Sequence, residues 1–102
     1  MLAAEMLEAG LQAQIIEMAH ELGWLHYHTY DSRKSAEGFP DLVLVKGKRI
    51  IFAELKRQKT KATLNQEKWL EALKATEKVE VFLWRPSDLL DGSIARTLGG
   101  IG

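Results

Sequence analysis

The feature that most constrains the fold is a pair of apolar segments on either side of a short polar turn at residues 46–48. Residues 40–45 (PDLVLV) and 49–57 (RIIFAELKR) are rich in aliphatic and β-branched side chains, which favour strands. The turn has glycine at the first of its two central positions, which suits a tight two-residue hairpin. The register that follows sets Asp41 directly opposite Glu54, whereas a loop of odd length would put these side chains on opposite faces of the sheet.

Two facing carboxylates call for a cation between them, because like charges directly opposite one another in a sheet repel. Lys56 lies two residues after Glu54 and therefore projects from the same face. The strand around Glu54 is apolar on both faces, which predicts a central strand, and central strands rarely carry an unpaired charge. A Pro-Asp pair or a Glu-x-Lys triplet alone is more often structural, but together they predict a functional site formed by Asp41, Glu54 and Lys56.

The rest of the chain predicts a single α/β domain, since 102 residues suffice for one hydrophobic core. Apolar residues at helical spacing predict a helix over residues 2–22, which ends at Gly23, and a second helix over 64–77. The other segments are predicted as a strand (24–30), a polar loop (31–38), a mostly apolar strand (79–84) and two short helical pieces within 87–98 that begin at Ser87 and Ser93. The expected order is helix, three strands, helix, strand and a short helical tail.

Each predicted helix carries one polar residue on its apolar side. Glu8 falls inside the apolar arc of the first helix, where a carboxylate should be partnered, protonated or linked to a metal. Alternatively, Glu8 interacts with the helix dipole near the helix N-terminus. Gln66 lies at the centre of the apolar stripe of the second helix, but Thr63 and Gln66 also have the spacing of a capping box. A site role and a structural role are therefore open for both residues.

Charge is balanced over the chain, with 14 Lys and Arg against 14 Asp and Glu, so a nucleic acid must be held by a local patch. Residues 46–61 contain seven basic residues and one acid. The candidates for DNA contact are the cations at the site end of this segment, two cations of the preceding polar loop and one histidine: Lys56, Arg57, Lys59, Lys61, Arg33, Lys34 and His28. For His28, packing is the alternative.

The chain has no cysteine, which excludes disulfides, thiol catalysis and cysteine-based zinc sites and suits a reducing cytosol. It also lacks a stretch of about 18 apolar residues that could span a membrane. We therefore expect a cytoplasmic protein with no membrane partner and no nucleotide cofactor.

Four motifs stand in a characteristic order and spacing: Gly38-Phe39-Pro40-Asp41, Phe52-Ala53-Glu54-Leu55-Lys56, Gln66 with Trp69-Leu70, and Trp84-Arg85-Pro86. Together they resemble the virus-type replication-repair nuclease (VRR-NUC) family of the PD-(D/E)XK nuclease superfamily. Glu8, followed by Leu11, Gln12 and Ile15, is similar to the acidic motif of that family's first helix. The resemblance covers roughly residues 8–90. Thr60 departs from it, because relatives often have glycine at that turn.

The resemblance implies a restriction-endonuclease-like αβββαβ core with a central mixed sheet flanked by helices, and a metal-dependent hydrolysis of DNA phosphodiester bonds. We expect Asp41 and Glu54 to bind Mg²⁺ or Mn²⁺ directly. By resemblance, the Leu55 carbonyl would be a further ligand, and Glu8 would act through water or on a second ion. Lys56 would position the attacking water and contact the scissile phosphate, and Gln66 would orient Lys56 or the water.

Stand-alone members of this size resemble phage or bacterial proteins and tend to be homodimers, and some act on branched DNA such as four-way junctions. This implies a location in a bacterial cell or a phage-infected host. Three alternatives stay open: a non-catalytic DNA-binding or assembly module with the same fold, a sequence-specific enzyme of the same fold, and a small protein-interaction domain with an acidic helix.

Overall fold

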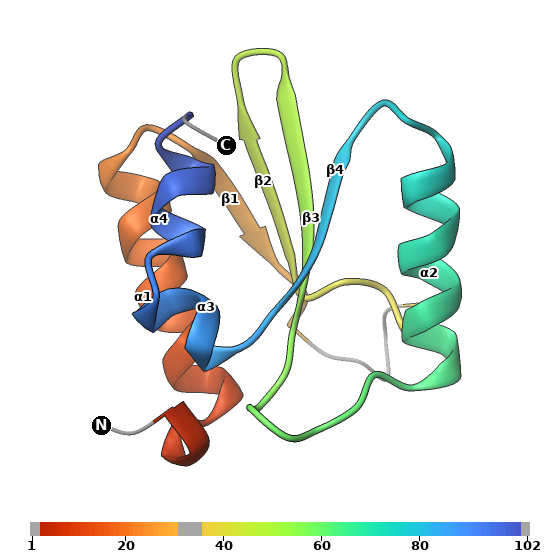
Figure 1. Cartoon of the computed structure of the whole chain (residues 1–102). Coiled ribbons are helices and arrows are strands. Elements are labelled where there is room, and N and C mark those ends of the chain that lie inside the picture. The colour runs from red at the N-terminus through yellow and green to blue at the C-terminus, as the bar shows by residue number, and fades with distance from the viewer. Residues whose placement is uncertain (1–2, 31–35, 101–102) are drawn as a thin grey trace.

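The computed structural model describes residues 3–30 and 36–100, and Figure 1 shows a sheet with helices on both of its sides. The elements are the 3-10 helix η1 (Ala3–Glu5), helix α1 (Glu8–Glu21), strands β1 (Leu25–His28), β2 (Leu42–Lys46) and β3 (Arg49–Leu55), helix α2 (Leu64–Ala75), strand β4 (Glu80–Trp84) and helices α3 (Pro86–Leu90) and α4 (Ser93–Leu98). This order confirms the predicted αβββαβ core with a short helical tail.

The sheet has the strand order β1-β2-β3-β4, with β1, β2 and β3 antiparallel and β4 parallel to β3. The mixed sheet and the central position of β3 are as predicted. The hairpin pairs Lys46 with Arg49 and Leu42 with Ala53, which is the register predicted from its turn. Gly47 in this turn has φ 58°, a left-handed conformation that glycine adopts without strain. Because a parallel pair needs a crossover, α2 connects β3 to β4.

Side chains alternate along each strand, and this divides the sheet into two faces with different covers. The core face packs against α1, α3 and α4, which Figure 1 shows together on one side of the sheet. Its buried residues come from helices and strands alike: Met6, Leu11, Ile15, Ala19, Trp24, Leu42, Leu44, Ile51, Ala53, Leu55, Trp84, Ile94 and Leu98. The opposite face, which we call the site face, carries Phe52 and Glu54, and α2 covers part of it through Trp69, which packs on Phe39, while Phe39 packs on Phe52.

The continuous helix predicted over residues 2–22 is wrong at its N-terminal end. The chain forms η1 and then starts α1 only at Glu8, with Leu7 extended (φ −82°, ψ 159°) as the N-cap residue. Met6, just before this break, is 4% exposed and belongs to the core, whereas Leu7 is 57% exposed. The chain therefore bends to bury Met6, which a straight continuation of α1 would direct elsewhere.

The other boundary differences are small. The strand predicted over 24–30 is confined to β1, and both β3 and α2 end two residues before their predicted ends. Helix α3 begins at Pro86 and not at Ser87. An N–H at the first helical position would have no intrahelical partner, so proline, which lacks an N–H, is favourable there. No helix in the described part of the chain is long and apolar enough to cross a membrane.

Candidate active site

The two predicted carboxylates lie at the end of the sheet opposite to the hairpin turn. Glu54 is the penultimate residue of β3, and Asp41 directly precedes β2. They lie one residue beyond the pair of Leu42 with Ala53, and the two carboxyl groups are neighbours on the site face. Asp41 Oδ2 accepts a hydrogen bond from the backbone N–H of Leu55 at 2.8 Å. The structure thus brings the acid pair together in the register predicted from the sequence.

Glu54 is 1% exposed, yet within the described residues neither of its carboxylate oxygens has a hydrogen-bond partner. The pKa of the Glu54 carboxyl is raised to about 9, chiefly because of burial and further because of the neighbouring Asp41 carboxyl, whereas the charge of Lys56 opposes the increase. A buried carboxylate is stable only when it is paired, hydrogen-bonded or bound to a cation. The acid pair is therefore suited to share either a proton or a cation.

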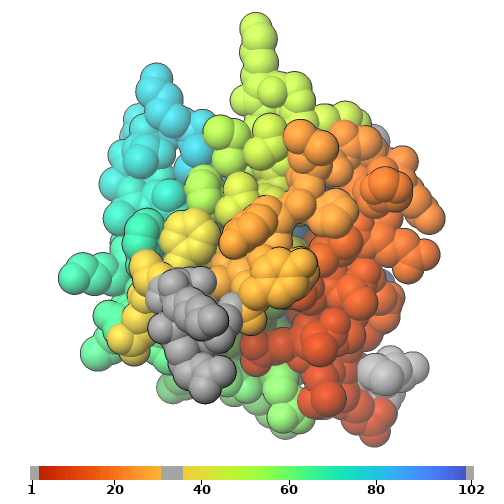
Figure 2. Space-filling view, turned by 180° about the vertical axis from the view of Figure 1, so that it is seen from behind, coloured from red at the N-terminus to blue at the C-terminus, as the bar shows by residue number. Residues whose placement is uncertain are grey.

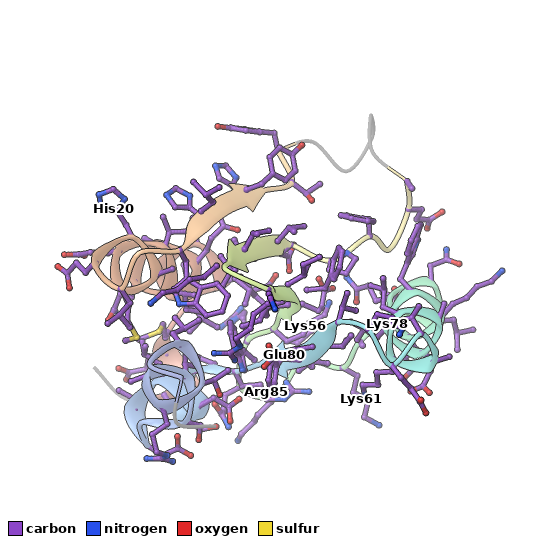
Figure 3. All side chains as sticks on the ribbon, turned by 90° about the horizontal axis from the view of Figure 1, so that it is seen from above. His20, Lys56, Lys61, Lys78, Glu80 and Arg85 are labelled. Atoms are coloured by element: carbon purple, nitrogen blue, oxygen red, sulfur yellow. The ribbon has the colours of Figure 1, made fainter. Side chains whose placement is uncertain are left out.

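Lys56 follows on the same face and is only 7% exposed. Its backbone N–H donates to the carbonyl of Trp84 at 3.1 Å, which extends the pairing of β3 with β4 by one residue. Figure 3 shows Lys56 at the level of the sheet, between α2 and the helices of the core face. The charge of Lys56 acts on the Glu54 carboxyl, so Lys56 and the acid pair form one electrostatic unit.

The segment before Asp41 is held against its neighbours on two sides. Gly38 has φ 86°, and a Cβ atom there would lie 2.5 Å from the backbone carbonyl carbon of Asn65 in α2. On the other side, the backbone N–H of Thr29 donates to the Asp41 carbonyl, and the Thr29 hydroxyl donates to the Pro40 carbonyl, both at 3.0 Å. Glycine is therefore required for a close approach that fixes the position of Asp41.

Gln66 forms the predicted capping box with Thr63. Its side-chain Oε1 accepts a hydrogen bond from the Thr63 backbone N–H at 2.8 Å, and its own backbone N–H donates to the Thr63 hydroxyl at 3.2 Å. The structural role of Gln66 is confirmed, and its role in the site stays a prediction. Figure 1 shows the N-terminal end of α2 at the same end of the molecule as the end of β3.

Glu8 is the half-buried first residue of α1. Figure 1 shows this start of α1 at the same end of the molecule as the end of β3. However, α1 packs on the core face, and among the described residues no group of three acidic or histidine side chains could hold one ion. The structure therefore does not bring Glu8 into one cluster with Asp41 and Glu54.

The cations that follow Lys56 lie between β3 and α2, in a segment that we call the basic loop (residues 57–61). Arg57, Lys59 and Lys61 are all exposed there, as contact with DNA requires. Figure 3 shows Lys61 on the side of α2. The basic loop therefore starts directly after the acid pair and Lys56.

The structure does not place the remaining DNA-binding candidates beside the acid pair. Arg33 and Lys34 lie outside the described residues. His28 pairs with Leu42 in the sheet, which places it on the face opposite to that of the acid pair. Its ring centre lies 4.1 Å from that of Tyr30, so packing describes its surroundings in the structure.

Two of the three cations near the hairpin turn contact neighbouring elements, whereas Lys48 in the turn is exposed. Arg49 forms a two-point ion pair with Glu80 of β4, at 2.8 and 2.6 Å, and its guanidinium lies 5.0 Å from the ring centre of Trp24. Lys46 Nζ donates to the Leu22 carbonyl at 2.6 Å. These two residues therefore fasten the hairpin to its neighbours.

Two residues of the sequence motifs, Leu55 and Arg85, have roles that were not identified from the sequence. The backbone N–H of Leu55 orients the Asp41 carboxylate, whereas the family resemblance implies a role only for the Leu55 carbonyl. Arg85, at the end of β4, donates to three carbonyls of the basic loop. A cation between a mostly apolar strand and Pro86, with Asp88 three residues later, is the signal that could have indicated the role of Arg85.

A half-buried aspartate opposite a buried glutamate, with a lysine two residues after the glutamate at the end of a central strand in an αβββαβ core, defines the class of PD-(D/E)XK nucleases. The family model described as the VRR-NUC domain matches residues 3–85, and the chain belongs to this family. It is accordingly a nuclease of the PD-(D/E)XK type with DNA as its substrate. Comparisons with curated proteins and with solved structures found no match.

We expect Gly38→Ala to destabilise the fold by about 1–3 kcal/mol, because the added methyl group collides with the Asn65 backbone and the positive φ strains alanine. Urea denaturation of wild type and variant measures the loss. Gly47→Ala is the matched control, since its φ is also positive but nothing lies within 4 Å of the added Cβ. A loss in Gly38→Ala no larger than in Gly47→Ala would contradict the required close approach.

We also expect the metal-free protein to lose stability as the pH rises from about 4.5 to about 9. In this range folded Glu54 keeps a proton that the unfolded chain releases, so each pH unit costs up to about 1.4 kcal/mol. Glu54→Gln removes this dependence and should be more stable than wild type at pH 8 in chelator. Denaturation curves at several pH values test this, with the exposed Glu17→Gln as control. Equal pH dependence in wild type and Glu54→Gln would show that Glu54 does not hold the proton.

Proposed function

We propose that this member of the VRR-NUC family is a metal-dependent endonuclease that hydrolyses phosphodiester bonds of branched DNA. The observation that carries the proposal is the buried Glu54 carboxylate, whose oxygens lack partners among the described residues although Asp41 and Lys56 are its neighbours. An acid pair that holds a proton between its members is suited to bind a cation in place of that proton, and a lysine beside it is suited to bind a phosphate.

The residues present fit a hard divalent cation. Carboxylate and carbonyl oxygens prefer Mg²⁺ or Mn²⁺ to softer metals. We assign Asp41 and Glu54 as direct ligands together with the Leu55 carbonyl, and Glu8 as a residue that acts through water or on a second ion. When bound, the ion supplies Lewis acidity and charge neutralisation to phosphodiester hydrolysis.

The other site residues act on the water and the phosphate. Lys56, held on the site face by the extended β3–β4 pairing, positions the attacking water and neutralises charge that develops on the scissile phosphate. Gln66 uses its carbonyl oxygen in the capping box, and its amide N–H₂ group is a donor. This amide group can donate to a water molecule, but it cannot form a hydrogen bond with the ammonium of Lys56, which is itself a donor.

DNA binding falls to Lys56 and the basic loop, because the chain has no net charge with which to attract DNA from every side. Arg33, Lys34 and His28 stay candidates for further contacts. Phosphate contacts carry no sequence information, so we infer recognition of DNA structure, such as a four-way junction. A two-fold homodimer would present two sites, as paired cuts across a junction require. We place this activity in the cytoplasm of a bacterial cell or a phage-infected host.

The wild-type protein should cleave DNA in Mg²⁺ or Mn²⁺ and not in chelator. Glu54→Gln and Lys56→Met should each reduce the cleavage rate by about a hundredfold or more, since each removes a group that neutralises or orients the reacting atoms. Glu17→Gln and Lys78→Met, which change exposed residues outside the site, are the matched controls. Undiminished cutting by either site variant would refute the role assigned to that residue.

Binding of Mg²⁺ alone to the protein, measured by calorimetry, gives a readout that does not depend on cleavage. We expect heat on titration of wild type and its loss in Glu54→Gln. DNA binding without metal uptake or cleavage would favour the non-catalytic module.

A panel of labelled linear, flap, nicked and four-way DNA substrates tests the proposed selectivity. We expect cleavage of the four-way junction to exceed that of the linear duplex by about tenfold or more, because only a branched substrate engages both sites of a dimer. Sedimentation of the same protein measures its oligomeric state. Equal rates on all substrates, or a monomer with full activity on junctions, would contradict this part of the proposal.

A further inference from the structure

The basic loop is short and carries its exposed cations at alternate positions. Arg57, Lys59 and Lys61 point to solvent, whereas Gln58 between them is half-buried. The Thr60 N–H donates to the Arg57 carbonyl at 3.2 Å, which closes a turn. One such bond is weak support for an exposed segment, so other contacts must determine its conformation.

Arg85 provides such contacts. Its Nη1 atom lies 2.7 Å from the Arg57 carbonyl oxygen, 3.2 Å from that of Gln58 and 2.6 Å from that of Thr60. The guanidinium is a donor group with fixed planar geometry, and hydrogen bonds from a charged donor are stronger than neutral ones. Arg85 is itself fixed, since its backbone N–H donates to Asp88 Oδ2 at 2.8 Å.

A second connection joins the basic loop to the start of α3. The Gln58 side chain donates to the Ser87 hydroxyl at 3.1 Å and accepts a hydrogen bond from the Ser87 backbone N–H at 3.0 Å. The carbonyls and Gln58 are thereby turned toward the end of β4 and the start of α3. The three cations are left on the outside of the loop, next to Lys56.

We infer that Arg85 is a positioning residue, which orders the basic loop for contact with the DNA backbone without contacting DNA itself. This inference rests on the proposed function. Fixing a residue's backbone costs free energy, and a loop that is ordered before binding does not pay that cost when DNA arrives. The guanidinium of Arg85 therefore contributes to DNA affinity through Arg57, Lys59 and Lys61.

The comparison of Arg85→Lys with Arg85→Gln separates positioning from direct contact. Lysine keeps the charge, but its ammonium ends one bond nearer the backbone than the Nη1 atom that contacts the three carbonyls, and glutamine keeps neither the charge nor the reach. We expect both variants to bind a labelled junction about five- to tenfold more weakly than wild type in chelator. With metal, we expect KM to rise by a similar factor in both, with kcat within about twofold of wild type. Arg96→Lys and Arg96→Gln, which change an exposed arginine on α4, are matched controls and should bind as wild type does.

The salt dependence of binding gives a second readout. The loop cations still reach phosphates in the variants, so the slope of log K against log salt should stay that of wild type while affinity falls. A slope reduced by about 0.9 in Arg85→Gln, with Arg85→Lys as tight as wild type, would mean that Arg85 binds a phosphate itself and would overturn the inference. Wild-type affinity in both variants would also overturn it.

Hydrogen exchange of the Thr60 amide tests the ordering of the loop without DNA. Exchange should be faster in both Arg85 variants than in wild type, and unchanged exchange would overturn the inference.

If the Arg85 variants do not fold, Gln58→Ala removes the second connection and should weaken binding about two- to threefold with faster exchange. An unchanged Gln58→Ala variant would count against ordering of the loop. Failure of the wild type to bind DNA would overturn the proposed function, whereas normal wild-type cleavage with unaffected variants would overturn only the role of Arg85.

Discussion

The candidate site depends on one constraint that the sheet imposes, namely the burial of the Glu54 carboxylate beside Asp41. This burial is unfavourable on its own, because a carboxylate loses its hydration and gains a like-charged neighbour. The sheet enforces it, since a slip of one residue in the hairpin would turn Glu54 toward the core face and expose Ile51. The tight turn and the ion pair between Arg49 and Glu80 hold this register at the far end of the hairpin. Residues remote from the site therefore maintain its unfavourable electrostatics.

The fold and the acid pair were predictable because they follow from local rules. The turn at residues 46–48 fixes the register, and alternation along the strand then decides which side chains share a face with Glu54. The capping box of Thr63 and Gln66 is likewise a matter of spacing within one turn of helix. Each of these predictions needs only residues that are close in sequence or directly paired.

The features that were missed depend on contacts between distant segments. The break before Glu8 follows from the burial of Met6 in a core assembled from the whole chain. Helical periodicity does not predict such a break. The contacts of Arg85 with the loop carbonyls join residues more than 20 positions apart. Every residue has a backbone carbonyl, so the sequence does not show which carbonyls accept these hydrogen bonds. The role of Glu8 in the site, which the family resemblance implies, stays a prediction, because the helical arc specifies a face of α1 and not the face of the sheet on which α1 packs.

The cations of residues 46–61 divide according to what they contact. Arg49 and Lys46 bind an acid and a carbonyl of neighbouring elements, and so contribute to the fold, whereas the cations of the basic loop are exposed beside the acid pair. In a chain without net charge, the three exposed cations of the basic loop thus follow directly after the end of the strand in which Glu54 is buried. Few cations give few phosphate contacts, so each contact must cost little to form. Ordering of the loop by Arg85 lowers that cost, and this explains how a neutral protein can bind DNA through one short segment.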